Sequence, residues 1–115
     1  LGSEWRQYEE IFPKIQNSTI DTVSLECHNS HVPFNLIELL RGKKVMIGAI
    51  DVATNKIETP EEVANTLRKA LEFIDVENIY PSTNCGMAPL SRNVAREKLS
   101  ALSAGAKIIR KELGI

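Results

Sequence analysis

The chain has 115 residues, of which 43% are hydrophobic and 25% are charged, and its formal net charge is −1. These proportions are typical of a globular domain or a piece of one, and the charge gives no reason to expect a nucleic-acid partner or an anionic membrane surface. No apolar run approaches the roughly 20 residues that a membrane-spanning helix needs, and no signal-peptide pattern is present. Two cysteines, Cys27 and Cys85, are too few for a disulfide framework, although one bridge between them stays open. We therefore expect reduced thiols, a cytoplasmic location and no membrane partner.

The first third of the chain predicts a helix, a strand and a second helix. Apolar residues at helical spacing indicate a short helix over residues 4–15, which Pro13 is expected to end or kink. Residues 19–26 are rich in β-branched side chains and predict a strand of about five residues. That strand ends on Glu26. A helix of about two turns is expected over residues 34–40.

The second strand is the clearest element in the sequence. Residues 44–52 form a near-continuous apolar run, which is typical of a parallel strand that is covered on both faces. Gly48 within this run indicates close packing against another backbone. The run ends at Asp51, so a second carboxylate follows a strand end.

The last half of the chain predicts helix, strand and helix. Thr59 is a good N-cap and Glu62 completes a capping box, so a helix begins there. A third strand is expected over residues 76–81. The final helix has apolar residues every three or four positions and is about 20 residues long; these apolar residues are Ala95, Leu99, Leu102, Ala106, Ile109 and Leu113.

Alternating helices and strands define the expected fold class, an α/β protein with parallel βαβ units. Three parallel strands leave two open apolar edges, whereas a barrel of this kind closes with eight strands. Either the sheet is completed by association, or residues 1–115 are the last part of a longer barrel. We favour the second interpretation, in which the chain is the C-terminal portion of a (β/α)8 catalytic domain whose N-terminal strands are missing, because the opening residues resemble mid-domain sequence.

Three candidate functional residues follow the three strands. Glu26, Asp51 and Cys85 are all expected at the carboxyl edge of the sheet, where α/β proteins place their chemistry. A carboxylate and a thiolate are both zinc ligands, but zinc sites need three or four protein ligands and this pair supplies two. Simpler roles stay open: Glu26 could cap a helix or pair with Arg92, and Asp51 could close a turn through Asn55.

A different metal site is conceivable in the loop after the first strand. Cys27, His28 and His31 form a Cys-His-x-x-His pattern, and Cys27, His31 and Cys85 could together bind a metal ion. We expect the two histidines to be exposed loop residues instead.

Four motifs resemble the C-terminal end of cobalamin-independent methionine synthase, and most closely its short single-barrel relatives. They are Ser24-Leu25-Glu26, Gly48-Ala49-Ile50-Asp51-Val52, Ile57-Glu58-Thr59-Pro60-Glu61-Glu62-Val63 and Asn84-Cys85-Gly86-Met87. The most specific motif is Asn-Cys-Gly followed by an arginine, here Cys85 with Arg92.

The resemblance implies zinc-dependent methyl transfer to the thiol of homocysteine, which gives methionine. It implies that Glu26 and Cys85 are two of the zinc ligands, that the remaining His-x-Cys pair lies upstream, and that Asp51 orients substrate beside the metal. The methyl donor of the family is a methylated folate, and the donor used by short relatives stays open. Many relatives have a histidine where this chain has Ala53, so no acid–base group is expected there.

Because half of the implied metal ligands are missing, we expect the isolated chain to bind zinc weakly and to be inactive. Two other hypotheses stay open. A related branch of the barrel family adds a thiol coenzyme to an epoxide, and another decarboxylates porphyrins without zinc. The chain could also be a non-catalytic folded fragment or an interaction module.

Overall fold

The computed structural model describes residues 6–28 and 34–115. Eight elements occur in these residues. In chain order they are α1 (Arg6–Gln16), β1 (Thr22–Glu26), the 3-10 helix η1 (Phe34–Leu40), β2 (Lys44–Ile50), α2 (Pro60–Leu71), the 3-10 helix η2 (Val76–Asn78), β3 (Ile79–Thr83) and α3 (Arg92–Leu113).

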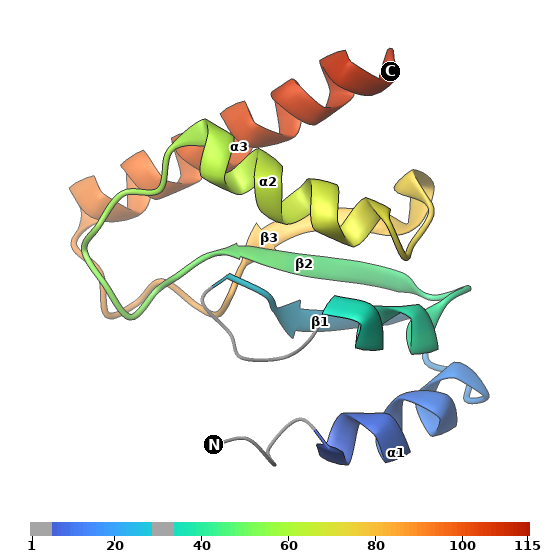
Figure 1. Ribbon diagram of the computed structural model, residues 1–115. Helices are drawn as coiled ribbons and strands as arrows, with labels where there is room; N and C mark the ends of the chain where they lie inside the picture. Colours follow the sequence, from blue (N-terminus) through green and yellow to red (C-terminus); the bar gives the residue numbers. More distant parts are fainter. Residues whose placement is uncertain (1–5, 29–33) are drawn as a thin grey trace.

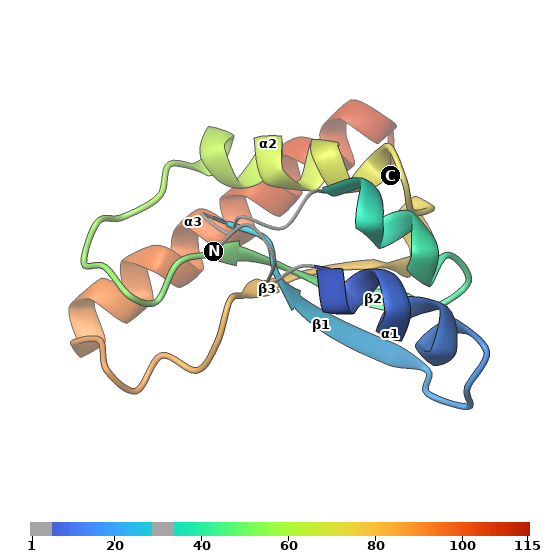
Figure 2. The same ribbon diagram turned by 60° about the horizontal axis from the view of Figure 1, so that its bottom comes forward.

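The three strands form one parallel sheet in the order β1-β2-β3. Figure 1 shows α2 and α3 packed side by side over the sheet, while α1 and η1 lie together near β1. Figure 2, turned by 60°, shows the long connections at one end of the strands, which lead from β2 to α2 and from β3 to α3. The α/β class with parallel βαβ units is therefore confirmed.

Three elements differ from the sequence prediction. Pro13 lies inside α1, which continues to Gln16, and the N–H of Asn17 donates to the Pro13 carbonyl at 3.2 Å. The segment Phe34–Leu40 is a 3-10 helix and not an α-helix. The third strand starts at Ile79, three residues later than expected, because Val76–Asn78 first form a tight turn.

One hydrophobic cluster joins the sheet to its helices. The buried members are Phe12, Leu36, Ile37, Leu40, Val45, Ile47, Ala49, Ile50, Val63, Ala64, Leu67, Ala70, Ile74 and Ile109. They come from α1, η1, β2, α2 and α3 and from the segment after α2, so the described elements share a single core.

The opposite face of the sheet is open. Ser24, Met46 and Tyr80 are aligned across the three strands, and all three are exposed, Met46 by 37% and Tyr80 by 43%. The prediction that β2 is covered on both faces is therefore wrong at Met46, because the segments that bury Ile47–Ile50 do not reach this position; those four residues are all buried.

The start of α2 and its contact with α3 fix the position of the long helix. Thr59 caps α2 and forms the predicted capping box with Glu62. Gly105 lets α3 approach α2 closely, since a Cβ added there would lie 2.5 Å from the Val63 Cβ and 2.9 Å from the Pro60 carbonyl oxygen. No helix in the described part of the chain is long and apolar enough to span a membrane.

The buried face of α3 agrees only in part with the stripe predicted from the sequence, since Ile109 is buried and Leu102 packs against the core. Leu99 and Leu113, two residues of the predicted stripe, are 48% and 44% exposed. The residues that α3 buries are Ile109, which was predicted, and Lys98, Ala101 and Gly105, which were not. Their spacings of three, four and four residues define one helix face, and that face contains a lysine.

Candidate functional site

The three residues predicted to share a sheet edge do so. Glu26 is the last residue of β1, Asp51 directly follows β2, and Cys85 comes two residues after β3. The strands are parallel, so all three lie at the carboxyl edge. Glu26 and Cys85 are exposed and Asp51 is half-buried, so the two predicted metal ligands are accessible.

Gly48 opens a space between the outer strands at this edge. Glu26, Gly48 and Ser82 are aligned across the sheet, so only the central position lacks a side chain. A Cβ on Gly48 would lie 2.5 Å from Asn84 Oδ1 and 2.7 Å from the Leu25 carbonyl oxygen. The predicted close packing at Gly48 is confirmed, and the Asn84 side chain occupies the space that the glycine leaves.

Asn84 connects the end of β3 to the end of β1. Its Nδ2 donates to the carbonyl oxygen of His28 at 2.9 Å. Asn84 Oδ1 and Ser82 Oγ are buried, and neither has a hydrogen-bond partner within residues 6–28 and 34–115.

A buried lysine from α3 reaches the loop between β2 and α2. The Lys98 side chain is fully buried, and its Nζ donates to Glu58 Oε1 at 2.9 Å, to the Asp51 carbonyl at 2.9 Å and to the Lys56 carbonyl at 2.6 Å. An ammonium group has three protons, so these three acceptors satisfy it completely. The positive charge is paired with Glu58, which is itself only 4% exposed.

The other oxygen of Glu58 extends this network to the strand ends. Glu58 Oε2 accepts a hydrogen bond from the Asp51 N–H at 2.9 Å and lies 3.8 Å from His28 Nε2. His28 is thus a half-buried residue beside a carboxylate, and the prediction that it is an exposed loop residue is wrong. His31 lies outside the described residues.

Asp51 closes a local turn. Its Oδ1 accepts a hydrogen bond from the Ala53 N–H at 2.9 Å, so the turn involves Ala53 and not Asn55 as the sequence suggested. The main-chain N–H and carbonyl of Asp51 are bound by Glu58 and Lys98 respectively. Both its side chain and its backbone are therefore held in place.

The described residues do not complete a metal site. No group of three or more His, Cys, Asp or Glu side chains within 6–28 and 34–115 is placed to hold a metal ion. Both cysteines are free thiols, so the single bridge considered from the sequence is absent. Burial raises the pKa of Cys27 to about 11, which disfavours the thiolate that an alternative site on Cys27 would need.

Sequence reasoning did not assign Glu58 and Lys98, although a signal for them existed. Glu58 lies within the segment 57–63, one of the four motifs that resemble the family, and Lys98 lies at helical spacing with Ala101 and Gly105. A lysine on the same helix face as small, buried residues needs a buried acceptor. The acceptor, Glu58, becomes evident only when the loop between β2 and α2 folds back onto α3.

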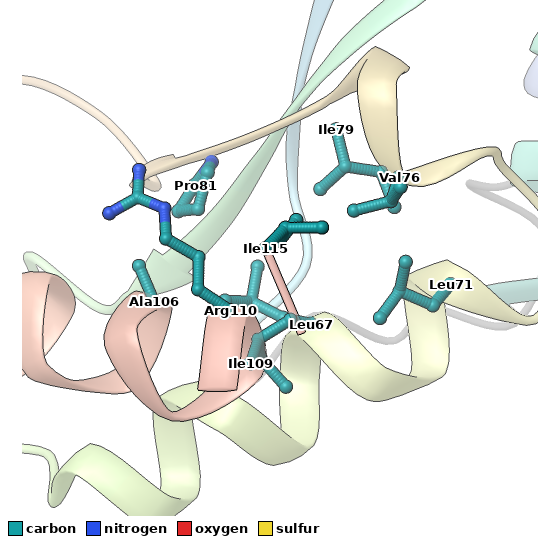
Figure 3. Close-up of a pocket in the computed structure, with 9 residues that line it drawn as sticks. All are labelled: Leu67, Leu71, Val76, Ile79, Pro81, Ala106, Ile109, Arg110 and Ile115. Carbon is teal, nitrogen blue, oxygen red and sulfur yellow. The ribbon is translucent and has the colours of Figure 1, made fainter. Parts of the chain in front are cut away.

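A separate hollow lies away from the strand ends. It has a volume of about 190 Å³ and is formed by α2, α3, η2, β3 and the C-terminus (Figure 3). Its lining is apolar apart from Arg110 and includes Ile79, the first residue of β3. Neither Glu26, Asp51 nor Cys85 lines it, so it is not part of the candidate site.

The fold and the site define a class: an α/β protein with functional groups gathered at the carboxyl ends of parallel strands. Comparison with known proteins identifies the family. The family model described as the catalytic domain of cobalamin-independent synthase matches residues 5–108, and the chain belongs to this family.

Similar proteins are methionine synthases. Those of Sulfurisphaera tokodaii and Saccharolobus solfataricus are each 34% identical to this chain, over 93% and 92% of its length. A solved B12-independent methionine synthase from Shewanella sp. W3-18-1, in complex with selenomethionine, is 73% identical over 98% of the chain, with a TM-score of 0.94. The chain spans 32% of each of the two curated relatives and 33% of the solved chain, about a third in each case.

Proposed function

We propose that residues 1–115 are the C-terminal portion of a (β/α)8 catalytic domain that transfers a methyl group to the thiol of homocysteine, giving methionine. The observation that carries the proposal is the alignment of Glu26, Asp51 and Cys85 at one sheet edge in a chain of this family. The selenomethionine bound to the similar Shewanella protein supports the choice of product, since it is the selenium analogue of methionine.

Glu26 and Cys85 would supply two zinc ligands from the ends of the two outer strands. A carboxylate oxygen and a thiolate sulfur both suit zinc, and both groups are exposed at the edge where a third and a fourth ligand could join them. Zinc, when bound, would stabilise the homocysteine thiolate at neutral pH. Asp51 would orient the substrate beside this site, since its own backbone is fixed on both sides.

The missing part of the barrel would supply the rest of the site. Zinc sites use three or four protein ligands, and this chain contributes two. The exposed row of Ser24, Met46 and Tyr80 on the sheet supports a further segment on this side. The methyl donor, for which we favour a methylated folate, and a cytoplasmic location belong to the same proposal.

Zinc titration in competition with a chromophoric chelator tests this proposal. We expect weak binding to the 115-residue chain alone, and one tightly bound zinc ion after the chain is joined to the other two thirds of a related methionine synthase. Cys85→Ser in the joined protein should abolish tight binding, whereas Cys27→Ser should leave it intact. Tight stoichiometric zinc on the isolated chain, or unchanged zinc binding by Cys85→Ser, would contradict the proposal.

Activity assays with different thiols distinguish methyl transfer to homocysteine from the alternative reactions. The joined protein should methylate homocysteine and should not alkylate other thiols such as a thiol coenzyme. Turnover with another thiol alone would indicate a different zinc-dependent alkyl transferase. Absence of zinc and of any turnover in the joined protein would favour a non-catalytic fragment.

A further inference from the structure

The buried pair Lys98–Glu58 lies outside the residues to which the proposed reaction assigns a role. It is the place where α3, the β2–α2 loop and the end of β1 meet, through Lys98, Asp51 and His28. A buried ion pair is weak evidence for stability, because desolvation of the two charges offsets much of their attraction. Stability alone therefore does not explain why the chain buries this ion pair.

Both sides of Asp51 are bound by the same pair. Glu58 Oε2 accepts from the Asp51 N–H, and Lys98 Nζ donates to the Asp51 carbonyl, each at 2.9 Å. Lys98 also holds the carbonyl of Lys56 at 2.6 Å, so it closes the loop that follows β2. The main chain at Asp51 is thus held by two residues that are themselves buried and cannot reach an exposed substrate, while the Asp51 side chain accepts from the Ala53 N–H.

The network continues to the neighbouring strands. His28 lies two residues after Glu26, with its ring nitrogen 3.8 Å from Glu58 and its carbonyl oxygen bound by Asn84. Asn84 directly precedes Cys85. One chain of contacts therefore runs from α3 to the ends of all three strands, next to each of the proposed functional residues.

We propose that Lys98 and Glu58 are positioning residues, which fix Asp51 and His28 in the geometry that the reaction needs. This inference rests on the proposed function only for its effect on turnover. Its structural part, the control of the Asp51 backbone, holds independently. The pair acts through Asp51 and His28 and does not touch the reacting atoms.

The variant Lys98→Met/Glu58→Met tests the proposal without leaving a buried charge behind. Replacement of a buried ion pair by apolar side chains of similar volume is often neutral for stability. We expect this variant of the 115-residue chain to fold, and its Asp51 amide hydrogen to exchange roughly 10-fold faster because one hydrogen bond is lost. In the joined protein we expect kcat with homocysteine to fall about 10- to 100-fold.

The exposed pair Arg68–Glu112 provides the matched control. It also joins residues far apart in the sequence, and it links α2 to α3 away from the strand ends. Arg68→Met/Glu112→Met makes the same chemical change and should leave both the Asp51 amide exchange and kcat within about twofold of the parent protein.

Three outcomes decide the matter. Folded Lys98→Met/Glu58→Met with parental Asp51 exchange and parental kcat overturns the proposal. If that variant does not fold, Lys98→Met/Glu58→Gln replaces it. The glutamine keeps an acceptor for the Asp51 N–H, whereas the Asp51 and Lys56 carbonyls lose their donor. A fall in kcat of less than about twofold in this variant overturns the proposal. A joined parent protein that is inactive refutes the proposed function, while the exchange measurement still decides whether the pair holds Asp51.

Discussion

At the scale of single residues, Gly48 decides how closely the strand ends approach each other. It lies between Glu26 and Ser82 in the sheet register, and Asn84 occupies the space above it. Two of the three nearest atoms to an added Cβ belong to the backbone, so they cannot move aside as a flexible side chain could. The shape of the candidate site therefore depends on the absence of one methyl group.

We expect Gly48→Ala to lower the free energy of unfolding by about 1–3 kcal/mol, because an added Cβ would overlap the Leu25 carbonyl and the Asn84 Cα. Urea-induced unfolding measures this change. Gly86→Ala is the control, since a Cβ there meets nothing within 4 Å, and it should change stability by no more than about 0.5 kcal/mol. Equal stability of the two variants would show that the close approach is not constrained.

The buried thiol of Cys27 should make the free energy of unfolding depend on pH. Burial raises the pKa of its thiol from 9.0 to about 11, so the folded state keeps a proton that the unfolded state loses. The contribution of Cys27 is therefore constant below pH 9 and falls as the pH rises from 9 to 11, by about 2–3 kcal/mol in total.

The measurement is the difference in unfolding free energy between the parent chain and Cys27→Ala at pH 8 and at pH 10.5. That comparison removes the effects of lysine and tyrosine titration, which the two proteins share. We expect the difference to shift against the parent at the higher pH. A pH-independent difference would mean that the folded thiol titrates normally.

At the scale of elements, α2 is the helix whose start connects the site to the core. Its first turn is held by Thr59 and Glu62, and it follows directly on the loop that Glu58 and Lys98 close. The helix cap and the Glu58–Lys98 network therefore stabilise consecutive residues, so loss of the cap should also loosen the loop before α2.

We expect Thr59→Ala to lower the free energy of unfolding by about 1 kcal/mol, because the Glu62 N–H loses its acceptor. Thermal unfolding followed by circular dichroism measures the loss. Thr54→Ala is a suitable control: its hydroxyl accepts from the nearby Lys56 N–H in the loop and caps no helix, so a smaller effect is expected. An equal effect at both positions would argue against a specific cap.

At the scale of the whole molecule, the sheet is covered on one side and open on the other. Ser24, Met46 and Tyr80 form an exposed row across it, and β1 and β3 are unpaired at their outer edges among the described residues. Unpaired parallel edges and an exposed apolar face favour association with further strands.

We expect the isolated 12.8 kDa chain to associate at micromolar concentration. Met46→Lys/Tyr80→Lys should shift it toward the monomer, because two charges would be placed on the open face. Sedimentation velocity measures the change. Leu99→Lys, at an exposed position of α3, is the control and should leave association unchanged. A parent chain that is monomeric at all concentrations would contradict the expectation.

The sequence by itself determined the order of elements, the parallel class and the placement of Glu26, Asp51 and Cys85 after three strands. These features depend on local patterns: apolar runs, a capping box at Thr59, and residues that directly follow strands. The roles of these three residues belong to the proposed function.

Only the tertiary structure decided which face of α3 is buried and what holds Asp51. Leu99 continues an apolar stripe in the sequence and is nevertheless exposed, whereas Lys98 is fully buried. The reason is that a lysine can be buried only where acceptors from distant segments converge on it, here Glu58 and the carbonyls of Asp51 and Lys56. Such convergence is a property of the folded chain, and the helical spacing of Lys98 with Ala101 and Gly105 does not by itself identify these acceptors.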